Sequence, residues 1–245
     1  MPLHHLTGRD LLLAALVSSL GTGAVETWIA SFNPDELANE WEWIREVENG
    51  WGVGSRDETL RITALIGTLA STRNNVRNIL LMHPISHAFL AEVVVEFDCS
   101  EVGEQAGIIL YEDDDDYVAV VRRCDWCPGE EGRCRTREVY LVGEVDGIPL
   151  EETALFYGGG ATNVRIALRK EGDVVSAYRH DTLIGQVQLP ETGNGFSRVG
   201  LIANNESNRS TQTRALFSHF TIYYLEGIQP QDGDDSQQMF LETPS

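Results

Sequence analysis

Apolar and polar residues alternate along much of the chain between residues 88 and 224, and this pattern predicts β-strands. In the clearest segment, 89–97, five apolar residues occupy alternate positions: Phe89, Ala91, Val93, Val95 and Phe97. Because successive side chains of a strand point to opposite faces, these five form one apolar face. Further strands are expected at 138–145, 163–169, 173–181, 184–189, 198–203 and 215–224. No helix is expected after the apolar N-terminal segment, so the pattern favours an all-β sandwich of antiparallel strands.

A hairpin is expected at residues 104–123, where two apolar runs flank the four aspartates Asp113–Asp116. Aspartate is depleted from strands and common in turns, so these residues are predicted to form the turn. A four-residue turn would pair Glu112 with Tyr117 and Leu110 with Ala119. One face of the hairpin would then carry Gln105, Ile109, Tyr111, Val118, Val120 and Arg122.

The acidic turn has two interpretations. A calcium loop needs six to eight oxygens that converge from spaced positions, usually with a glycine at the sharp bend. Four consecutive aspartates lack that spacing. We therefore expect a solvated turn, with a structural calcium ion as the alternative and with no other cofactor.

The overall charge restricts the partners. The 245 residues include 18 Lys and Arg against 38 Asp and Glu, a net charge of −20. Such a chain repels phosphate backbones and anionic lipids, which argues against nucleic-acid and membrane binding. A neutral or cationic partner fits better.

Three regions are expected along the chain. Residues 1–25 contain the apolar run Leu11–Leu20 and predict a signal peptide, with an N-terminal helix docked on the protein as the alternative. Residues 26–226 form the sandwich, and the polar, acidic residues 227–245 form a disordered tail. Secretion would place the protein outside the cell.

The four cysteines also indicate whether the protein is secreted. If segments 88–98, 106–111 and 117–123 are successive antiparallel strands, Cys99 and Cys124 emerge at the same end of the sheet, close to Cys127 and Cys134. Two disulfides in an oxidising compartment are expected, with a zinc knot of four thiolates as the alternative. If the protein is secreted from a eukaryote, the sequons at Asn205 and Asn208 predict glycosylation.

Two tryptophans and an arginine alternate near the start of the sandwich. In an extended chain, Trp41, Trp43 and Arg45 share one face. The indoles could belong to the core, or they could form a platform on which a sugar stacks. The sequence contains no nucleophile elbow, zinc-protease motif or phosphate-binding loop, so it supports none of these chemistries.

The order of the motifs resembles a known family. The motifs lie between Trp28 and Tyr224 and are Trp41-x-Trp43-x-Arg45-Glu46, Gly50-Trp51, Leu60-Arg61-Ile62, Gly67-Thr68-Leu69, Arg77-Asn78-Ile79-Leu80-Leu81, Gly103-Glu104-Gln105-Ala106-Gly107, Tyr111 with the acidic turn to Tyr117, Arg198-Val199-Gly200-Leu201 and Ala215-x-Phe217-x-x-Phe220. This order resembles the concanavalin A-like β-sandwich at the C-terminus of family 43 β-xylosidases and related free-standing proteins. The resemblance implies a jelly roll of two antiparallel sheets whose concave face can meet carbohydrate. In those xylosidases the catalytic acid and base belong to a separate propeller, which we do not expect in this chain.

The expected function is therefore carbohydrate binding, by a lectin-like or accessory module that holds a neutral oligosaccharide or polysaccharide on the concave face. The predicted ligand-binding residues are Trp41, Trp43, Arg45, Arg77, Asn78, Gln105 and Arg122. One alternative is a glycan-active hydrolase with a cross-strand carboxylate pair, for which Glu104 and Glu112 are candidates. Another is an interaction subunit without a sugar ligand. The sequence predicts no oligomeric state.

Overall fold

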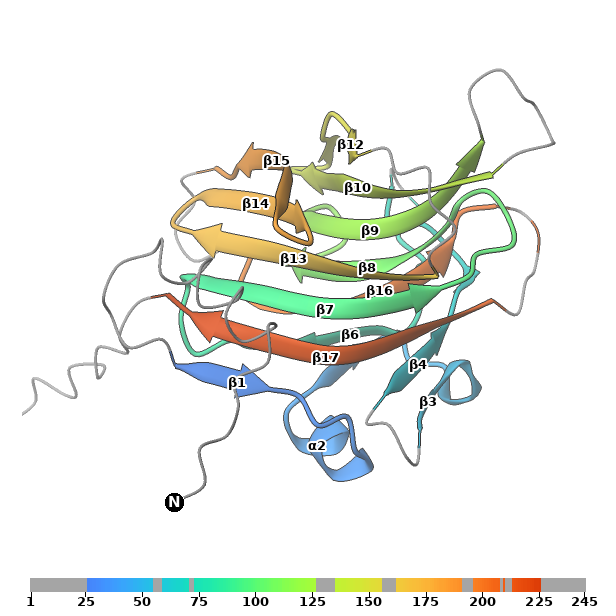
Figure 1. Cartoon of the computed structure of the whole chain (residues 1–245), viewed down its shortest axis with the longest axis horizontal. Helices are drawn as coiled ribbons and strands as arrows, with labels where there is room; N and C mark the ends of the chain where they lie inside the picture. The colour runs from blue at the N-terminus through green and yellow to red at the C-terminus, as the bar shows by residue number, and fades with distance from the viewer. Residues whose placement is uncertain are drawn as a thin grey trace, which may run out of the picture.

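Two β-sheets packed face to face make up the described part of the chain (Figure 1). The computed structural model describes residues 26–54, 59–70, 73–126, 135–155, 162–190, 196–207, 209 and 213–225. The N-terminal segment 1–25 and the tail 227–245 lie outside the described residues, so the signal peptide and the disordered tail stay predictions.

Sheet A has eight strands within the described residues, in the spatial order β15-β14-β13-β7-β17-β4-β3, with β1 also paired to β17. In Figure 1, β13, β7 and β17 run across the front of the molecule. The strands are β1 (Thr27–Ile29), β3 (Trp51–Val53), β4 (Leu60–Thr63), β7 (Phe89–Phe97), β13 (Asn163–Glu171), β14 (Val174–Arg179), β15 (Thr182–Gln188) and β17 (Arg214–Tyr224).

Sheet B has nine strands within the same described ranges, in the order β11-β10-β9-β8-β16-β6-β2, with β12 paired to β10 and β5 paired to β16. Only the β5–β16 pair among these is parallel. The strands are β2 (Glu42–Ile44), β5 (Leu65–Ile66), β6 (Ile79–Met82), β8 (Glu104–Tyr111), β9 (Tyr117–Trp126), β10 (Arg135–Val145), β11 (Ile148–Pro149), β12 (Thr153–Leu155) and β16 (Arg198–Asn205).

Short helical segments were not predicted. Helix α2 (Pro34–Asn39) has proline in its first turn, where its missing N–H costs nothing, and Leu37 N donates to Asn33 O at 3.0 Å. The 3-10 turn η1 (Glu48–Gly50) follows β2. Both are too short to produce a periodic apolar pattern. In the described residues, no helix is both long and apolar enough to cross a membrane.

The main core lies between the sheets. The predicted apolar face of β7 is confirmed, because all five of its alternate residues are buried there. Val164, Ile166 and Leu168 of β13 face the same core, as the alternation on that strand predicts. Alternation between a buried and an outer face therefore organises both sheets.

The predicted order of three successive antiparallel strands is wrong. Strand β7 pairs with β13 and β17 in sheet A, whereas β8 pairs with β9 and β16 in sheet B. The chain therefore crosses from one sheet to the other between Phe97 and Glu104. This crossing lets the apolar face of β7 pack against the apolar face of β8 across the core.

A disulfide joins the two sheets at this crossing. Cys99, just after β7, bonds to Cys124 of β9 across a sequence separation of 25 residues. The expected proximity of these two cysteines is confirmed, although the strands that carry them belong to different sheets. Cys127 and Cys134 lie outside the described residues.

The register of the β8–β9 hairpin differs from the prediction by one residue. Tyr111 pairs with Tyr117, and Glu112 N donates to Asp116 O at 3.0 Å, so the loop has five residues, 112–116. A shift of one residue moves every side chain of a strand to the opposite face. The outer face of β9 therefore carries Tyr117, Ala119, Val121 and Arg123, whereas Val118 and Val120 lie in the core between the sheets.

We expect the cross-sheet disulfide to stabilise the fold. Closing a loop of this length lowers the entropy of the unfolded chain, which is worth about 3.5 kcal/mol, so Cys99→Ala combined with Cys124→Ala should lower the free energy of unfolding by that amount in urea denaturation. The control Cys127→Ala with Cys134→Ala keeps the Cys99–Cys124 bond, and adding a reductant should lower its stability by a similar amount relative to its own oxidised form. Equal stability of the first variant and the wild type would contradict the assignment.

Candidate functional site

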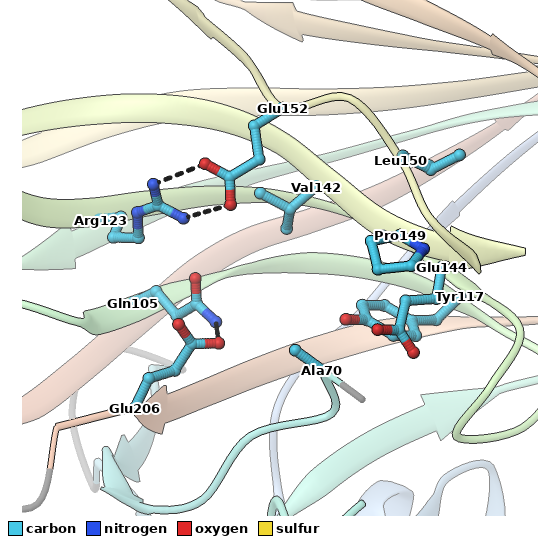
Figure 2. A pocket seen from close by; sticks show the side chains of 11 residues that line it. Ala70, Gln105, Tyr117, Arg123, Val142, Glu144, Pro149, Leu150, Glu152 and Glu206 are labelled. Atoms are coloured by element: carbon cyan, nitrogen blue, oxygen red, sulfur yellow. Dashed lines mark hydrogen bonds and ion pairs between the residues drawn. The ribbon is translucent and has the colours of Figure 1, made fainter. Parts of the chain in front are cut away.

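A hollow of about 100 Å³ opens on the outer face of sheet B (Figure 2). Strands β8, β9 and β10 form one side of it, and segment 149–152 forms another. Pockets that enclose a drug-sized ligand measure about 300–1,000 Å³, so this hollow suits one end of a ligand. The lining residues are Ala70, Gln105, Tyr117, Arg123, Val142, Gly143, Glu144, Pro149, Leu150, Glu152 and Glu206.

A second apolar cluster lies beside the hollow on the same outer face. It contains Ile109, Val121 and Ile202 from the sheet, and Leu69 and Val76 from the segment between β5 and β6 pack on them. The outer face of sheet B is thus partly covered by the chain itself. A ligand has access to polar groups of β8, β9 and β10 at the hollow.

Arg123 is held firmly at one side of the hollow. Its Nη1 and Nη2 donate to the two carboxylate oxygens of Glu152 at 2.9 and 2.8 Å, and its guanidinium carbon lies 3.9 Å from the ring centre of Tyr140. Burial alone would lower the pKa of Arg123, but the hydrogen bonds and the charge of Glu152 outweigh it and raise the pKa. The pair keeps Glu152 positioned at the rim.

Gln105 and Glu206 lie side by side at the hollow and are hydrogen-bonded to each other (Figure 2). Gln105 Nε2 donates to Glu206 Oε1 at 3.1 Å, and Thr68 Oγ1 donates to the same oxygen at 3.2 Å. Gln105 is 7% exposed, and its Oε1 has no hydrogen-bond partner among the described residues. A buried acceptor of this kind costs free energy until a donor reaches it.

Burial favours the neutral form of two acidic groups at the hollow, Glu206 and Tyr117. Although Glu206 is exposed as a residue, its carboxylate is directed inward at Gln105, and burial is the largest cause that raises its pKa. Burial and the charge of Glu144 raise the pKa of the Tyr117 hydroxyl, which therefore stays protonated at neutral pH. The hollow combines hydrogen-bond donors and acceptors from Gln105, Tyr117 and Arg123 with three glutamates.

The two predicted tryptophans do not form an open platform. They point to the same side as expected, but that side is the interior: Trp41 is 7% exposed and contacts Phe220 at 5.3 Å between ring centres. Trp43 is half-buried at the edge of the sandwich, where it stacks on Trp51 at 4.8 Å. The prediction that Trp41 binds a ligand is wrong, because the indole is a core side chain.

The predicted arginines have separate locations. Arg45 has a φ of 53°, which ends the strand alternation, and its guanidinium pairs with Asp114 at 2.7 and 2.8 Å. Arg77 is exposed and does not line the hollow. Arg122 is 4% exposed and lies on the core side of β9, so the prediction that it binds a ligand on the concave face is wrong. The residue that reaches the hollow is Arg123.

Two predicted asparagines are structural. Asn78 is fully buried and its Oδ1 accepts a hydrogen bond from Val47 N at 2.6 Å, so it is not a ligand-binding surface residue. Asn205 is also fully buried, and its Nδ2 donates to Arg209 O at 2.9 Å. This amide is not accessible for a glycan in the folded chain, which contradicts the prediction for Asn205. Asn208 lies outside the described residues.

The carboxylates proposed for catalysis also have structural partners. Glu104 Oε2 accepts hydrogen bonds from Ser100 N at 2.6 Å and from Glu101 N at 3.0 Å. Glu112 Oε2 accepts one from Phe196 N at 2.8 Å. Neither residue lines the hollow.

Three aspartates of the acidic turn form ion pairs or hydrogen bonds with other parts of the protein. Asp114 binds Arg45, Asp115 accepts a hydrogen bond from Asn74 at 3.0 Å, and Asp116 accepts one from Asp146 N at 2.7 Å. Across the described ranges, no group of three or more His, Cys, Asp or Glu side chains could hold a metal ion. The turn therefore fastens neighbouring loops.

Gln105 is the one predicted ligand-binding residue that lines the hollow. The sequence analysis missed Tyr117, Arg123, Glu144, Glu152 and Glu206. A predicted loop of five residues would have placed Tyr117 and Arg123 on the same face of the hairpin as Gln105. Glu152 and Glu206 lie in irregular segments. The alternation of apolar and polar residues predicts strands only, so it could not predict where these two side chains lie.

Comparisons with known proteins agree on the architecture. The family described as beta xylosidase C-terminal concanavalin A-like domain matches residues 30–222. A solved structure of the GH43 BlXynB protein from Bacillus licheniformis aligns with a TM-score of 0.64 at 19% identity, covering 81% of this chain and 39% of that protein. The Bacteroides ovatus protein named Xyloglucan PUL GH43B aligns with a TM-score of 0.63 at 14% identity, covering 83% of this chain and 40% of that protein.

A smaller solved protein aligns over its whole length. A functionally unknown protein from Saccharomyces cerevisiae gives a TM-score of 0.58 at 16% identity, covering 78% of this chain and 99% of that protein. No curated protein sequence matches the chain. These structural similarities establish the fold, and the chain spans about two fifths of the two larger proteins.

The raised pKa of Glu206 predicts a dependence of stability on pH. Because burial favours its neutral form, its contribution is fully present below the ordinary carboxyl pKa, about 4.3, and is lost as pH rises through the raised value. Glu206→Gln should therefore unfold at a higher temperature than the wild type at neutral pH and at the same temperature near pH 3.5 (about one unit below that pKa). Glu151→Gln, an exposed neighbour of the hollow, is the control. A difference that does not change with pH would contradict the prediction.

Proposed function

Because the chain belongs to the family of beta xylosidase C-terminal concanavalin A-like domains, we propose that it binds carbohydrate in the hollow on the outer face of sheet B. One observation carries the proposal: Gln105 lines the hollow, and its side-chain carbonyl is buried without a hydrogen-bond donor among the described residues. A sugar hydroxyl is a donor of the right size. Its binding would remove the cost of this acceptor.

The surrounding groups support a neutral sugar. Sugar hydroxyls both donate and accept hydrogen bonds, and the hollow offers the Tyr117 hydroxyl and the guanidinium of Arg123 beside carboxylate acceptors. Within the hollow, Glu152 is already paired with Arg123, and the net charge of the chain is −20. A sugar with its own negative charge would be repelled there.

The mode of binding follows from the small volume and from the buried aromatics. Tyr117 and Tyr140 are each 7% exposed, so neither offers a broad stacking surface. Recognition would depend on hydrogen bonds to one terminal sugar. We expect a Kd on the order of 1 mM, about −4 kcal/mol. We place this binding outside the cell, because a disulfide such as Cys99–Cys124 persists in oxidising compartments.

The test is an NMR titration of the labelled protein with neutral xylo-, arabino- and gluco-oligosaccharides. Gln105→Leu keeps the size of the side chain and removes the acceptor, so it should weaken binding by about tenfold. Gln188→Leu, an exposed glutamine on β15 of sheet A, is the matched control and should bind like the wild type. Unchanged affinity of Gln105→Leu would reject the hollow as the site. Absence of binding to every neutral glycan would reject the function and favour an interaction subunit without a sugar ligand.

A second candidate, glycoside hydrolysis, is favoured by one observation. The hollow brings together Glu144, Glu152 and Glu206 from different segments, and burial raises the pKa of Glu206 while Arg123 binds Glu152. A glycosidase needs a protonated acid beside an ionised carboxylate. Glu206 would protonate the leaving oxygen, and Glu152 or Glu144 would act as nucleophile or base.

Hydrolysis is tested with aryl β-xylosides and aryl arabinofuranosides. If Glu206 is the acid, Glu206→Gln should lower kcat by about 100-fold or more on substrates with poor leaving groups, and less on those with activated ones. Glu151→Gln, which lies outside the hollow, should keep wild-type rates. A wild-type protein without turnover above background would eliminate this candidate and leave the binding proposal intact.

A further inference from the structure

A second pocket, of about 230 Å³, lies at the edge of the sandwich where β4 of sheet A leads into β5 of sheet B. It shares no lining residue with the hollow on sheet B. Its lining combines two arginines with two small polar side chains. The residues are Val47, Asn49, Gly50, Arg61, Thr63, Leu65 and Arg214.

The two arginines belong to neighbouring strands. Arg61 of β4 pairs with Leu216 of β17, and Arg214 pairs with Thr63. This register makes the two arginines diagonal neighbours on one face. The guanidinium of Arg61 extends over Gly52, where an added Cβ would lie 2.8 Å from Nη2. Gly52 thus leaves space for this arginine over β3.

Neither arginine of the pocket has an acidic partner within the described residues. Elsewhere, Arg45 binds Asp114, Arg123 binds Glu152, and Arg165 binds Asp181 at 2.7 Å. The chain has 38 acidic residues for 18 basic ones, so acidic partners are abundant. Two cations in one pocket without a counter-charge repel each other. A bound anion would convert that repulsion into attraction.

Two described acidic residues that lie next to residues of the pocket along the chain, Glu46 and Glu48, do not line it. Glu46 accepts a hydrogen bond from the Trp51 indole at 2.9 Å, and Glu48 of η1 is exposed and does not line the pocket. The polar residues that do line it, Asn49 and Thr63, carry an amide and a hydroxyl that can donate to an oxygen. The pocket therefore presents donors and positive charge in a chain that is otherwise strongly acidic.

We infer that this pocket binds an oxyanion: a carboxylate, sulfate or phosphate group carried by a small molecule. Guanidinium groups bind such anions through paired N–H donors, and two arginines line the pocket. The site is separate from the proposed sugar site and does not depend on it.

The test is an NMR titration with sodium sulfate, inorganic phosphate and glucuronate, each at constant ionic strength. Wild-type protein should give saturable shifts with at least one probe at a Kd of about 5 mM or below. Arg61→Gln and Arg214→Gln should each raise that Kd about tenfold. Arg77→Gln is the matched control, because it removes the same charge from an exposed arginine outside the pocket, and it should change the Kd by less than about twofold.

Two results would overturn the inference: no saturable shift with any probe up to about 50 mM, or equal weakening by Arg77→Gln, which would mean that binding is only a general charge effect. Since Arg214 is exposed, its variant keeps the test valid if Arg61→Gln fails to fold. Neutral oligosaccharides should bind Arg61→Gln and the wild type alike, so failure of one proposal is distinguishable from failure of the other.

Discussion

The register between β8 and β9 is the constraint on which the candidate site depends. Pairing of Tyr111 with Tyr117 sends one set of alternate side chains into the core between the sheets and the other set to the outer face of sheet B. Gln105 and Arg123 are directly opposite each other in this register. The core fixes it, because a slip by one residue would bury Arg123 and expose the apolar set of β9.

Sheet B has apolar clusters on both faces, whereas many antiparallel sheets expose one polar face to solvent. Its inner face packs against sheet A, while Leu69 and Val76 cover part of its outer face. Polar groups that lie close to this covered surface are partly desolvated, and most have a partner within the protein. The carbonyl of Gln105 has none among the described residues, and the carboxylate of Glu206 has a raised pKa for the same physical reason, removal from water.

The charges of this acidic chain are organised locally. Asp114 forms an ion pair with Arg45, and Glu152 forms one with Arg123 at the hollow, so the protein itself neutralises these two arginines. In the second pocket, by contrast, Arg61 and Arg214 have no carboxylate partner among the described residues. The two sites therefore differ in the ligand that they favour: neutral and polyhydroxylated at the hollow, negatively charged at the arginine pocket.

The sequence by itself determined the all-β sandwich, the buried faces of β7 and β13, the acidic turn and the proximity of Cys99 to Cys124, because alternation and turn chemistry are local properties. It also indicated Gln105. Tertiary structure decided the rest. It determined which sheet each strand joins and the burial of Trp41 and Asn78. It also set the five-residue loop, which places Arg123 instead of Arg122 on the outer face of sheet B. Alternation states that two residues share a face, but only packing of one sheet on the other decides whether that face is core or surface. The gathering of Glu144, Glu152 and Glu206 depends on contacts between distant segments, which no local pattern contains.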